Sequence, residues 1–294
     1  MSGARTASGV GLGLRHDLAA EMFERDPAEV DWVEIHPENY VARGGAFQLN
    51  LERARDRWPI LPHGLSLCFG TTSRFDAAYV AQLRQLLDAI DAPFYSDHLC
   101  FAGIDGTFLH DLLPLPFNRE SVRTAASRVA ELRDAIERPV AVENISYYAD
   151  PLAPAHGWDE PDFLLEVLEA ADCKLLLDVN NIYVNARNHR FDPHPYIERI
   201  PRERVVQIHV AGHHTQKDGQ IIDTHGEPVC EGVYSLLEHT LERIGPVPVL
   251  LERDQNFPPL EELLEEMRRL HAIYDRATAR FAEAHGEPRA EARP

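Results

Sequence analysis

Short apolar runs alternate with longer amphipathic stretches along almost the whole chain. An apolar run of four to eight residues is typical of a buried strand, whereas apolar residues spaced three and four apart predict a helix. The strand pattern occurs eight times, at residues 9–14, 31–36, 60–67, 93–99, 139–145, 174–179, 205–210 and 248–252. The helical pattern fills the intervals, at residues 17–25, 46–57, 76–91, 118–137, 159–171, 195–200, 233–244 and 260–284.

Eight strands that are each followed by a helix predict an α/β protein of the (β/α)8 TIM-barrel class. Continuous apolar runs at 140–142, 175–177 and 249–251 are typical of parallel strands that are covered on both faces. A doubly wound open sheet is the alternative, but the glycine pattern at 9–13 is too short for its nucleotide-binding turn. We expect one domain over residues 1–284 and a flexible tail over 285–294.

Composition narrows the class of protein. The chain has 294 residues, of which 44% are hydrophobic, and a formal net charge of −19. This charge argues against a nucleic-acid partner, because phosphate binding needs an excess of Lys and Arg. No apolar stretch is long enough for a membrane span, and no secretory signal is present, so we expect a cytoplasmic protein. The cysteines are widely spaced and are expected to be free thiols: Cys68, Cys100, Cys173 and Cys230.

Metal-ligating residue types recur at the ends of the predicted strands. In a TIM barrel these ends form the active site. Six such residues lie within or directly after an apolar run: His63, His98, Glu143, Asp178, His209 and Glu252. Buried carboxylates need cations, and oxygen and nitrogen ligands without thiolate favour iron, manganese or zinc. The set is too large for one ion, so two or three are expected.

The remaining polar residues receive weaker assignments. Asp97 and Asn144 adjoin candidate ligands, and strand alternation points them away from the barrel axis, where they would support ligands. His16, His239, His271 and His285 lie in helical or terminal stretches and are expected at the surface.

Long loops at 147–160 and 213–229 are typical of functional segments.

Several motifs, in order, resemble those of the DUF692 or UPF0276 family, whose characterised members are multinuclear non-heme iron-dependent oxidases (MNIO). The motifs are EIHPENY (34–40), PHGLSL (62–67), YSDHL (95–99), VENIS (142–146), LLDVNNIYVN (176–185), IHVAGH (208–213), DTHG (223–226) and LLERDQNFP (250–258). The resemblance covers roughly residues 9–275, and its last two motifs look most similar to the bufferin-associated branch. It implies a xylose isomerase-like TIM barrel.

The resemblance also implies an activity, namely the dioxygen-dependent modification of cysteine residues in a ribosomally synthesised precursor peptide by two or three irons. One iron would be held by His63, His98 and Glu143 and a second by Asp178, His209 and Glu252, and Glu143 could bridge the two. A third would be held by Asp223 and His225 with His213 or Asn181. Asp254 or a nearby histidine such as His213 would move protons. A separate protein that recognises the precursor's leader is a further expected partner.

Three other functions remain open at this point. A metal-dependent sugar isomerase or epimerase on the same barrel would use similar ligands without dioxygen. A three-zinc endonuclease would need a basic surface, which the net charge opposes. A non-catalytic scaffold for peptide processing would bind no metal.

Overall fold

The computed structural model describes residues 6–104, 107–149 and 157–286. The chain packs as two compact units. Unit 1 is formed mainly by Glu34–Leu176, and unit 2 by Arg5–Val33 together with Leu177–Pro294. The expected single domain over 1–284 stays a prediction, and most of the expected tail lies outside the described residues.

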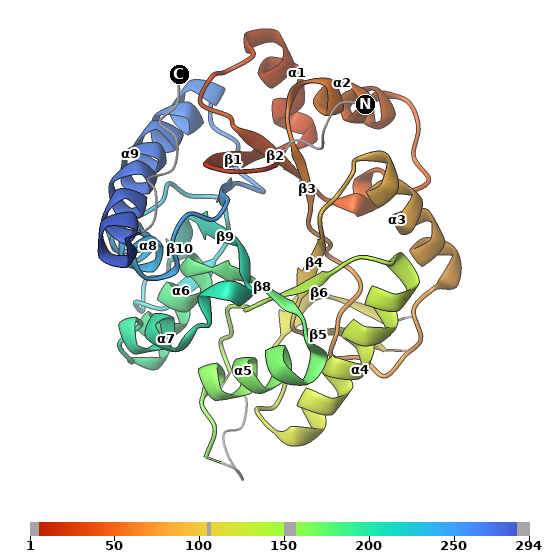
Figure 1. Ribbon diagram of the computed structural model, residues 1–294, viewed down its shortest axis with the longest axis vertical. Coiled ribbons are helices and arrows are strands. Elements are labelled where there is room, and N and C mark those ends of the chain that lie inside the picture. The colour runs from red at the N-terminus through yellow and green to blue at the C-terminus, as the bar shows by residue number, and fades with distance from the viewer. Residues whose placement is uncertain (1–5, 105–106, 150–156, 287–294) are drawn as a thin grey trace. The chain divides into compact units, whose positions relative to one another are not determined.

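All eight predicted strands are present, and they are parallel (Figure 1). Their bounds are β1 (Val10–Gly13), β2 (Trp32–Ile35), β3 (Ile60–Pro62), β4 (Tyr95–His98), β7 (Val140–Glu143), β8 (Lys174–Asp178), β9 (Val205–Ala211) and β12 (Val249–Glu252). Their order by hydrogen bonding is β3-β2-β1-β12-β9-β8-β7-β4. The parallel strands with intervening helices confirm the predicted (β/α)8 class.

The helices match the predicted segments with one addition. Those of unit 1 are α2 (Ala46–Arg57), α3 (Ala77–Ala89), α4 (Arg119–Ile136) and α5 (Glu160–Ala171). Those of unit 2 are α1 (His16–Arg25), α6 (Val179–His189), α7 (His194–Arg199), α8 (Glu231–Ile244) and α9 (Leu260–His285). Two short 3-10 helices, η1 (Pro37–Asn39) and η2 (Arg202–Arg204), complete the set in the described residues. Asp76, Asn118 and Asp159 accept backbone hydrogen bonds at the starts of α3, α4 and α5, as N-cap residues do.

The sequence did not predict α6 or two β-hairpins. Asp178 ends β8 and caps α6 at once, so no loop separates the two elements. The hairpins are formed by β5 (Phe101–Ile104) with β6 (Thr107–Leu113) and by β10 (His213–Thr215) with β11 (Ile221–Asp223). The second hairpin occupies part of the segment 213–229, which was expected to be a loop.

Each unit has its own apolar packing. In unit 1, α4 packs against α3 and α5, and its Leu132 and Ile136 are completely buried. In unit 2, α8 packs against α6, α7 and α9. Burying one such aliphatic side chain stabilises the fold by about 1.5–3 kcal/mol. His271 of α9 is also buried, contrary to expectation. Its Nε2 lies 2.8 Å from the carbonyl oxygen of Glu29, so the buried ring keeps a hydrogen-bond partner.

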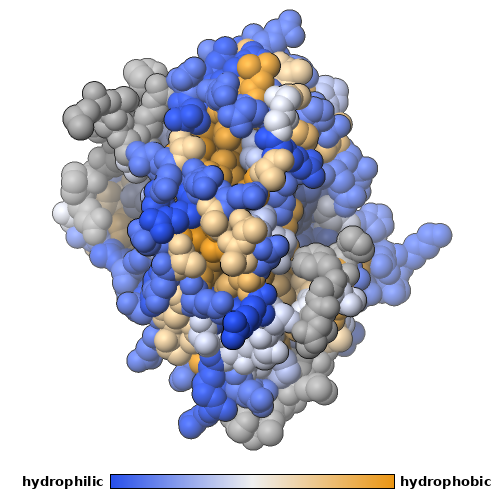
Figure 2. Space-filling model, turned by 90° about the vertical axis from the view of Figure 1, so that its right-hand side faces the viewer, coloured by the Kyte–Doolittle hydropathy of each residue, from blue (hydrophilic) through white to orange (hydrophobic). Residues whose placement is uncertain are grey.

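Hydrophilic residues predominate on the face shown in Figure 2, with apolar residues gathered near its centre. Among the described residues, no helix combines the length and the apolar character that a membrane span requires. The four cysteines carry no disulfide, in agreement with their expected state as free thiols.

Candidate metal centre

Three ligand-type side chains of unit 1 are brought together by the register of its strands. His98 ends β4 and Glu143 ends β7, and the two residues are paired across these strands. His63 directly follows β3 and bridges to Ser96 of β4. One ligand atom from each of His63, His98 and Glu143 lies within 4.8 Å of the other two. These three residues are hereafter cluster 1.

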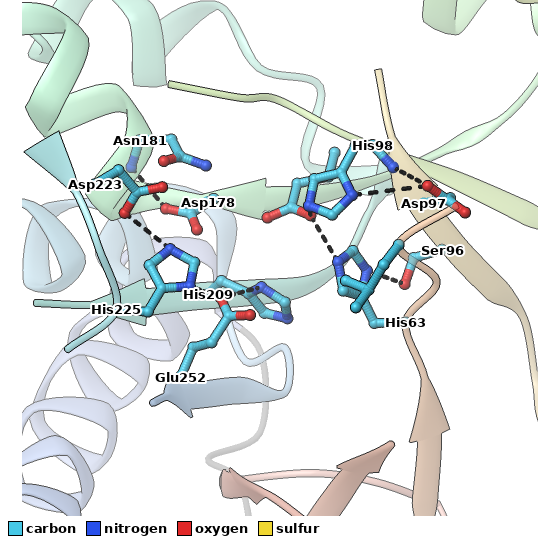
Figure 3. Close-up of polar contacts among 12 residues, drawn as sticks. His63, Ser96, Asp97, His98, Asp178, Asn181, His209, Asp223, His225 and Glu252 are labelled. Atoms are coloured by element: carbon cyan, nitrogen blue, oxygen red, sulfur yellow. Dashed lines mark hydrogen bonds and ion pairs between the residues drawn. The ribbon is translucent and has the colours of Figure 1, made fainter. Parts of the chain in front are cut away.

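In cluster 1, both imidazoles face the same carboxylate oxygen. Oε2 of Glu143 lies 3.1 Å from Nε2 of His63 and 3.3 Å from Nε2 of His98. The Ser96 hydroxyl donates to the carbonyl oxygen of Pro62 and therefore accepts from Nδ1–H of His63 at 3.0 Å (Figure 3). A neutral imidazole has only one N–H, so its Nε2 presents a lone pair to the carboxylate. This buried contact requires a proton or a metal cation.

Asp97 supports cluster 1 without joining it. Its Oδ2 accepts hydrogen bonds from the Tyr95 hydroxyl (2.7 Å) and the Leu67 amide (3.1 Å), and its Oδ1 accepts from the His98 amide (2.8 Å). Burial would raise the pKa of Asp97, but hydrogen bonding by His98 and Tyr95 lowers it. A Cβ on Gly64 would lie 1.7 Å from the Tyr95 hydroxyl oxygen, so only glycine permits this approach. Asp97 thus holds the segment that carries His63.

Unit 2 contains a second group of three ligand-type residues. Asp178 ends β8, His209 lies on β9, and Glu252 ends β12. The register of the parallel strands pairs His209 with Leu250 of β12. One ligand atom from each of Asp178, His209 and Glu252 lies within 4.8 Å of the other two. All three are buried, with exposed fractions of 0%, 0% and 3%, and they are hereafter cluster 2.

A buried glutamine controls the protonation of cluster 2. Nε2 of His209 lies 2.8 Å from Nε2 of Gln207, and an amide nitrogen can only donate. His209 therefore accepts at Nε2 and directs Nδ1–H at Oε2 of Glu252, 3.1 Å away. Turning the Gln207 amide by 180° would place its oxygen on Nε2–H and leave Nδ1 with a lone pair. Cluster 2 can thus hold either a proton or a metal between His209 and Glu252.

His225 lies among three carboxylates of unit 2. Its Nε2 is 2.8 Å from Oδ1 of Asp223, and its Nδ1 is 3.0 Å from Oδ2 of Asp254 and 3.4 Å from Oε2 of Glu252. Burial would lower the pKa of His225, but the charges of Asp223 and Glu252 raise it well above its ordinary value. Its backbone has a φ of +48°, a conformation that is rare outside glycine and is often found at functional sites. These four residues are hereafter the His225 group.

A buried arginine that the sequence analysis missed balances this charge. Arg15 follows β1 and is 7% exposed. Its Nε donates to Oδ1 of Asp254 at 2.8 Å, and a terminal nitrogen lies 3.7 Å from Oε1 of Glu252. Burial would raise the pKa of Asp254, but the Arg15 guanidinium and His225 hold it at about 2. The sequence did indicate its position, because Arg15 directly follows the first predicted strand, at the end where the candidate ligands of the other strands lie.

The two alternatives for a third ion differ in their surroundings. Asn181 is buried and lies beside Asp178, whose carboxylate accepts from its backbone amide at 2.7 Å (Figure 3). His213 lies on β10, and its Nδ1 is 2.8 Å from Oδ1 of Asn180. Among the described residues, His213 is in none of the groups of three or more ligand-type side chains.

The spacing of the ligand atoms fits a metal ion. Adjacent ligands of an octahedral ion with bonds of about 2.1 Å lie roughly 3.0 Å apart. The nitrogen-to-oxygen distances of 3.1 and 3.3 Å in cluster 1 are close to this value. The 3.1 Å distance in cluster 2 would match it once Nδ1 of His209 has lost its proton. Both clusters contain imidazole and carboxylate without thiolate, which suits iron, manganese or zinc. The residues present therefore fit a first-row divalent metal.

The fold and these clusters define a class, namely a (β/α)8 protein with buried histidine and carboxylate groups at the carboxyl ends of its strands. An L-ribulose 3-epimerase structure is similar over 98% of this chain and 100% of its own, with a TM-score of 0.62 and 13% identity. A xylose isomerase-like TIM barrel protein from Mycobacterium smegmatis, in complex with magnesium, covers 96% and 100% with a TM-score of 0.58 and 14% identity. The fold is therefore that of the xylose isomerase-like TIM barrels.

The sequence comparisons assign the family. Residues 9–275 match the family model described as "RiPP precursor modification enzyme MbnB/TglH/ChrH". A UPF0276 protein of Shewanella amazonensis is 44% identical over 88% of this chain and 92% of its own length. Another, from Pseudomonas aeruginosa, is 44% identical over 92% of this chain and 94% of its own. The chain belongs to this family of enzymes, which modify the precursors of ribosomally synthesised and post-translationally modified peptides (RiPPs).

Proposed function

We propose that this protein is a dioxygen-dependent, multinuclear iron oxidase that modifies cysteine residues of a RiPP precursor peptide in the cytoplasm. The observation that carries the proposal is the pair of buried imidazole–carboxylate clusters in a member of a RiPP-modifying family. Two imidazoles that face one buried carboxylate oxygen, at 3.1 and 3.3 Å, form a ligand set of the kind that the proposed iron would need.

Each cluster supplies ligands for one ion. Cluster 1 would hold one iron and cluster 2 a second, while Asp223 and His225 with Asn181 would hold a third. Bound iron would supply electrons for the reduction of dioxygen and would lower the pKa of a coordinated substrate thiol. Ser96 then acts as a positioning residue, because its hydroxyl fixes Nδ1 of His63 as the protonated ring nitrogen. Gln207 would do the same for His209 once its amide has turned by 180°.

Asp254 suits proton transfer between the site and solvent. Its side chain is 32% exposed, and its Oδ2 lies 3.0 Å from Nδ1 of the more buried His225. A proton released at His225 can therefore pass to Asp254 and then to water. The low pKa of Asp254, about 2, favours rapid onward release over storage of the proton. A peptide would be captured by the segment 213–229 and the segment 147–160, of which residues 150–156 lie outside the described part of the chain, or by a separate leader-recognition protein.

Co-expression tests this proposal directly. The gene would be expressed with each short, cysteine-containing reading frame that adjoins it, with iron, in air and under anaerobic conditions. The expected result is a peptide mass change that requires both iron and air and that maps to cysteine. Glu143→Gln should abolish the change, whereas the exposed Glu283→Gln should leave it intact.

A sugar epimerase would give the opposite result. Anaerobic interconversion of a ketose such as L-ribulose by the manganese-loaded protein, without a peptide modification in air, would replace the proposed function. Conversion of the peptide that persists without bound metal would equally contradict it.

A further inference from the structure

Unit 1 contains a cavity of about 410 Å³ that includes none of the candidate metal ligands. One side is formed by the hairpin of β5 and β6, and the other by the first turns of α4. Both belong to the connection that follows β4, and in a (β/α)8 protein such connections form the active-site face. The volume is typical of ligand-binding sites. This cavity is hereafter the β6–α4 groove.

The hairpin supplies an apolar wall. Its register pairs Phe101 with Leu113, so the two side chains lie on the same face of the hairpin. Both line the groove, and Leu113 is 43% exposed. Leu112 instead packs against the buried cluster that contains Cys68 and Cys100. One face of the hairpin is therefore used by the core of unit 1, whereas the face with Leu113 presents apolar surface to a ligand.

The segment between β6 and α4 makes this wall rigid. Pro114 and Pro116 flank Leu115, and proline fixes the backbone angle φ. The backbone amide of Asn118 donates to the carbonyl oxygen of Pro116 at 2.8 Å. A Cβ on Gly70 would lie 2.2 Å from Cδ2 of Leu115, so glycine is needed where the opposite segment closes the groove. A preformed groove loses less conformational entropy when it binds a ligand.

The helix supplies a polar wall. Ser121 and Thr124 line the groove and are three residues apart on α4, so they share a helix face. Both are half-buried. Within the described part of the chain, neither hydroxyl takes part in a hydrogen bond. A hydroxyl can both donate and accept, so this wall suits the amide and carbonyl groups of a peptide backbone.

A second, smaller cavity connects the groove with cluster 1. It has a volume of about 20 Å³, and it shares Pro114 and Leu115 with the groove as lining residues. Leu99 and Asn144 also line it, and they directly follow the cluster 1 residues of β4 and β7. The groove is therefore separated from the strand ends that carry cluster 1 by a single layer of side chains.

The chain itself limits the distance between groove and cluster. Phe101 follows His98 by three residues, and an extended chain spans at most about 3.6 Å per residue. The backbone of Phe101 thus lies within about 11 Å of the backbone of His98. An extended peptide covers this distance with about three of its own residues.

We propose that the β6–α4 groove binds the precursor peptide beside its modified cysteine. An apolar peptide residue about three positions from the cysteine packs on Phe101 and Leu113, and the adjoining backbone binds the hydroxyls of Ser121 and Thr124. The choice of the precursor rests on the proposed function, whereas the shape and polarity of the groove do not.

Other occupants fit the groove less well. A sugar would leave hydroxyls unpaired against the wall formed by Phe101, Leu113 and Leu115. A second copy of the chain or another folded protein needs about 800 Å² of surface on each partner, whereas the groove accepts only a few side chains. A peptide strand presents both the apolar side chains and the backbone groups that the two walls suit.

Binding is tested with a fluorescein-labelled synthetic peptide from each cysteine-containing reading frame that adjoins the gene. Serine replaces cysteine in these peptides, so the assay requires no conversion. Fluorescence anisotropy with the full-length protein should show saturable binding of one such peptide. Leu113→Asp should weaken it about tenfold or more, because it replaces a buried apolar contact with a charge.

The matched control is Leu49→Asp, which changes another exposed leucine of unit 1, on α2. It should bind the peptide as wild type does, and both variants should keep the wild-type thermal midpoint. Equal affinity of Leu113→Asp and wild type, or no saturable binding of any of these peptides to wild type, would overturn the proposal.

Photochemical cross-linking locates the bound segment. The photoreactive residue p-benzoylphenylalanine would replace Ser121, and mass spectrometry would identify the peptide residue to which it cross-links. We expect a residue within about three positions of the one that replaces cysteine. Cross-linking only to a distant part of the peptide, or only to a second copy of the chain, would overturn the assignment of the groove.

Kinetics with the cysteine-containing peptide separates this inference from the proposed function. Leu113→Asp should raise KM and leave kcat nearly unchanged, whereas Glu143→Gln should abolish conversion and still bind the peptide. A converted peptide with a wild-type KM for Leu113→Asp would contradict the inference alone. A peptide that binds and cross-links as expected but is never modified would contradict the proposed function alone.

Discussion

Cluster 1 in unit 1 differs from cluster 2 and the His225 group in unit 2 in the charges that surround its carboxylate. Cluster 1 combines two imidazoles with one carboxylate. In unit 2, cluster 2 and the His225 group together contain the carboxylates of Asp178, Glu252, Asp223 and Asp254 and two imidazoles, and the guanidinium of Arg15 lies beside them. The pKa of His225 is raised well above its ordinary value by these carboxylates. Under the proposed function, we therefore expect removal of metal to disturb cluster 1 more than this region, which keeps the Arg15 guanidinium as a cation.

The largest expected effect comes from removing one carboxylate in each region. Glu143→Gln should lower the metal content of cluster 1, and Glu252→Gln should lower that of cluster 2. Each change should lower peptide conversion by at least about 100-fold. Loss of a residue that only hydrogen-bonds to a metal ligand already costs 10- to 100-fold, and loss of the ligand itself should cost more. Metal content measured by mass spectrometry checks the loss. Retention of the full metal content in either variant would contradict the assignment of its carboxylate as a ligand.

Arg15 should matter most when metal is absent. Arg15→Met removes the cation that faces Asp254 and Glu252, and leaving one partner of a buried pair costs about 3–5 kcal/mol. We expect a lower denaturant midpoint for the metal-free variant and a much smaller difference after iron loading. An equal destabilisation in both states would show that metal does not neutralise this region.

Ser96→Ala should weaken metal binding to cluster 1 only. The loss of the acceptor for Nδ1–H of His63 allows the other tautomer and should reduce affinity roughly 10- to 100-fold. Competition with a chromophoric chelator measures this change. Ser127→Ala, at an exposed position on α4, is the matched control. A loss of affinity at cluster 2 instead would be inconsistent with the hydrogen bonding described for His63.

The smallest expected effect is the uptake and release of a proton in unit 2. The raised pKa of His225 keeps it protonated at neutral pH, so metal binding there should release about one proton and should strengthen as the pH rises. Without metal, the stabilising charge on His225 is fully present below the ordinary imidazole pKa of about 6.5. It is lost as the pH rises through the folded value. Calorimetry in buffers of different ionisation enthalpy measures the proton, and pH-independent binding would contradict the assignment.

The sequence located the strands well because parallel strands covered on both faces leave unmistakable apolar runs, such as the one around Leu175–Leu177. It missed α6, because Asp178 both ends β8 and caps the helix, so no turn or loop residues separate the two elements. The hairpin of β10 and β11 was missed because its short strands lie within a polar segment that resembles a loop.

The candidate site shows a similar limit. Strand ends indicated His63, Glu143 and Glu252, because position in the fold is enough to gather them. Ser96 acts through a hydrogen bond to the candidate ligand His63, and Arg15 acts through a hydrogen bond to Asp254. Neither belongs to a metal-ligating residue type. Spacing alone could not separate His213 from Asn181, since the difference depends on the hydrogen bond between His213 and Asn180.

Anomalous X-ray scattering at the iron edge, from anaerobically iron-loaded crystals, tests the central claim most directly. We predict one iron peak among His63, His98 and Glu143 and another among Asp178, His209 and Glu252, with Nε2 of His63 as a ligand. Crystals that contain no iron peak at either cluster, with a proton-mediated contact retained between His63 and Glu143, would contradict the account.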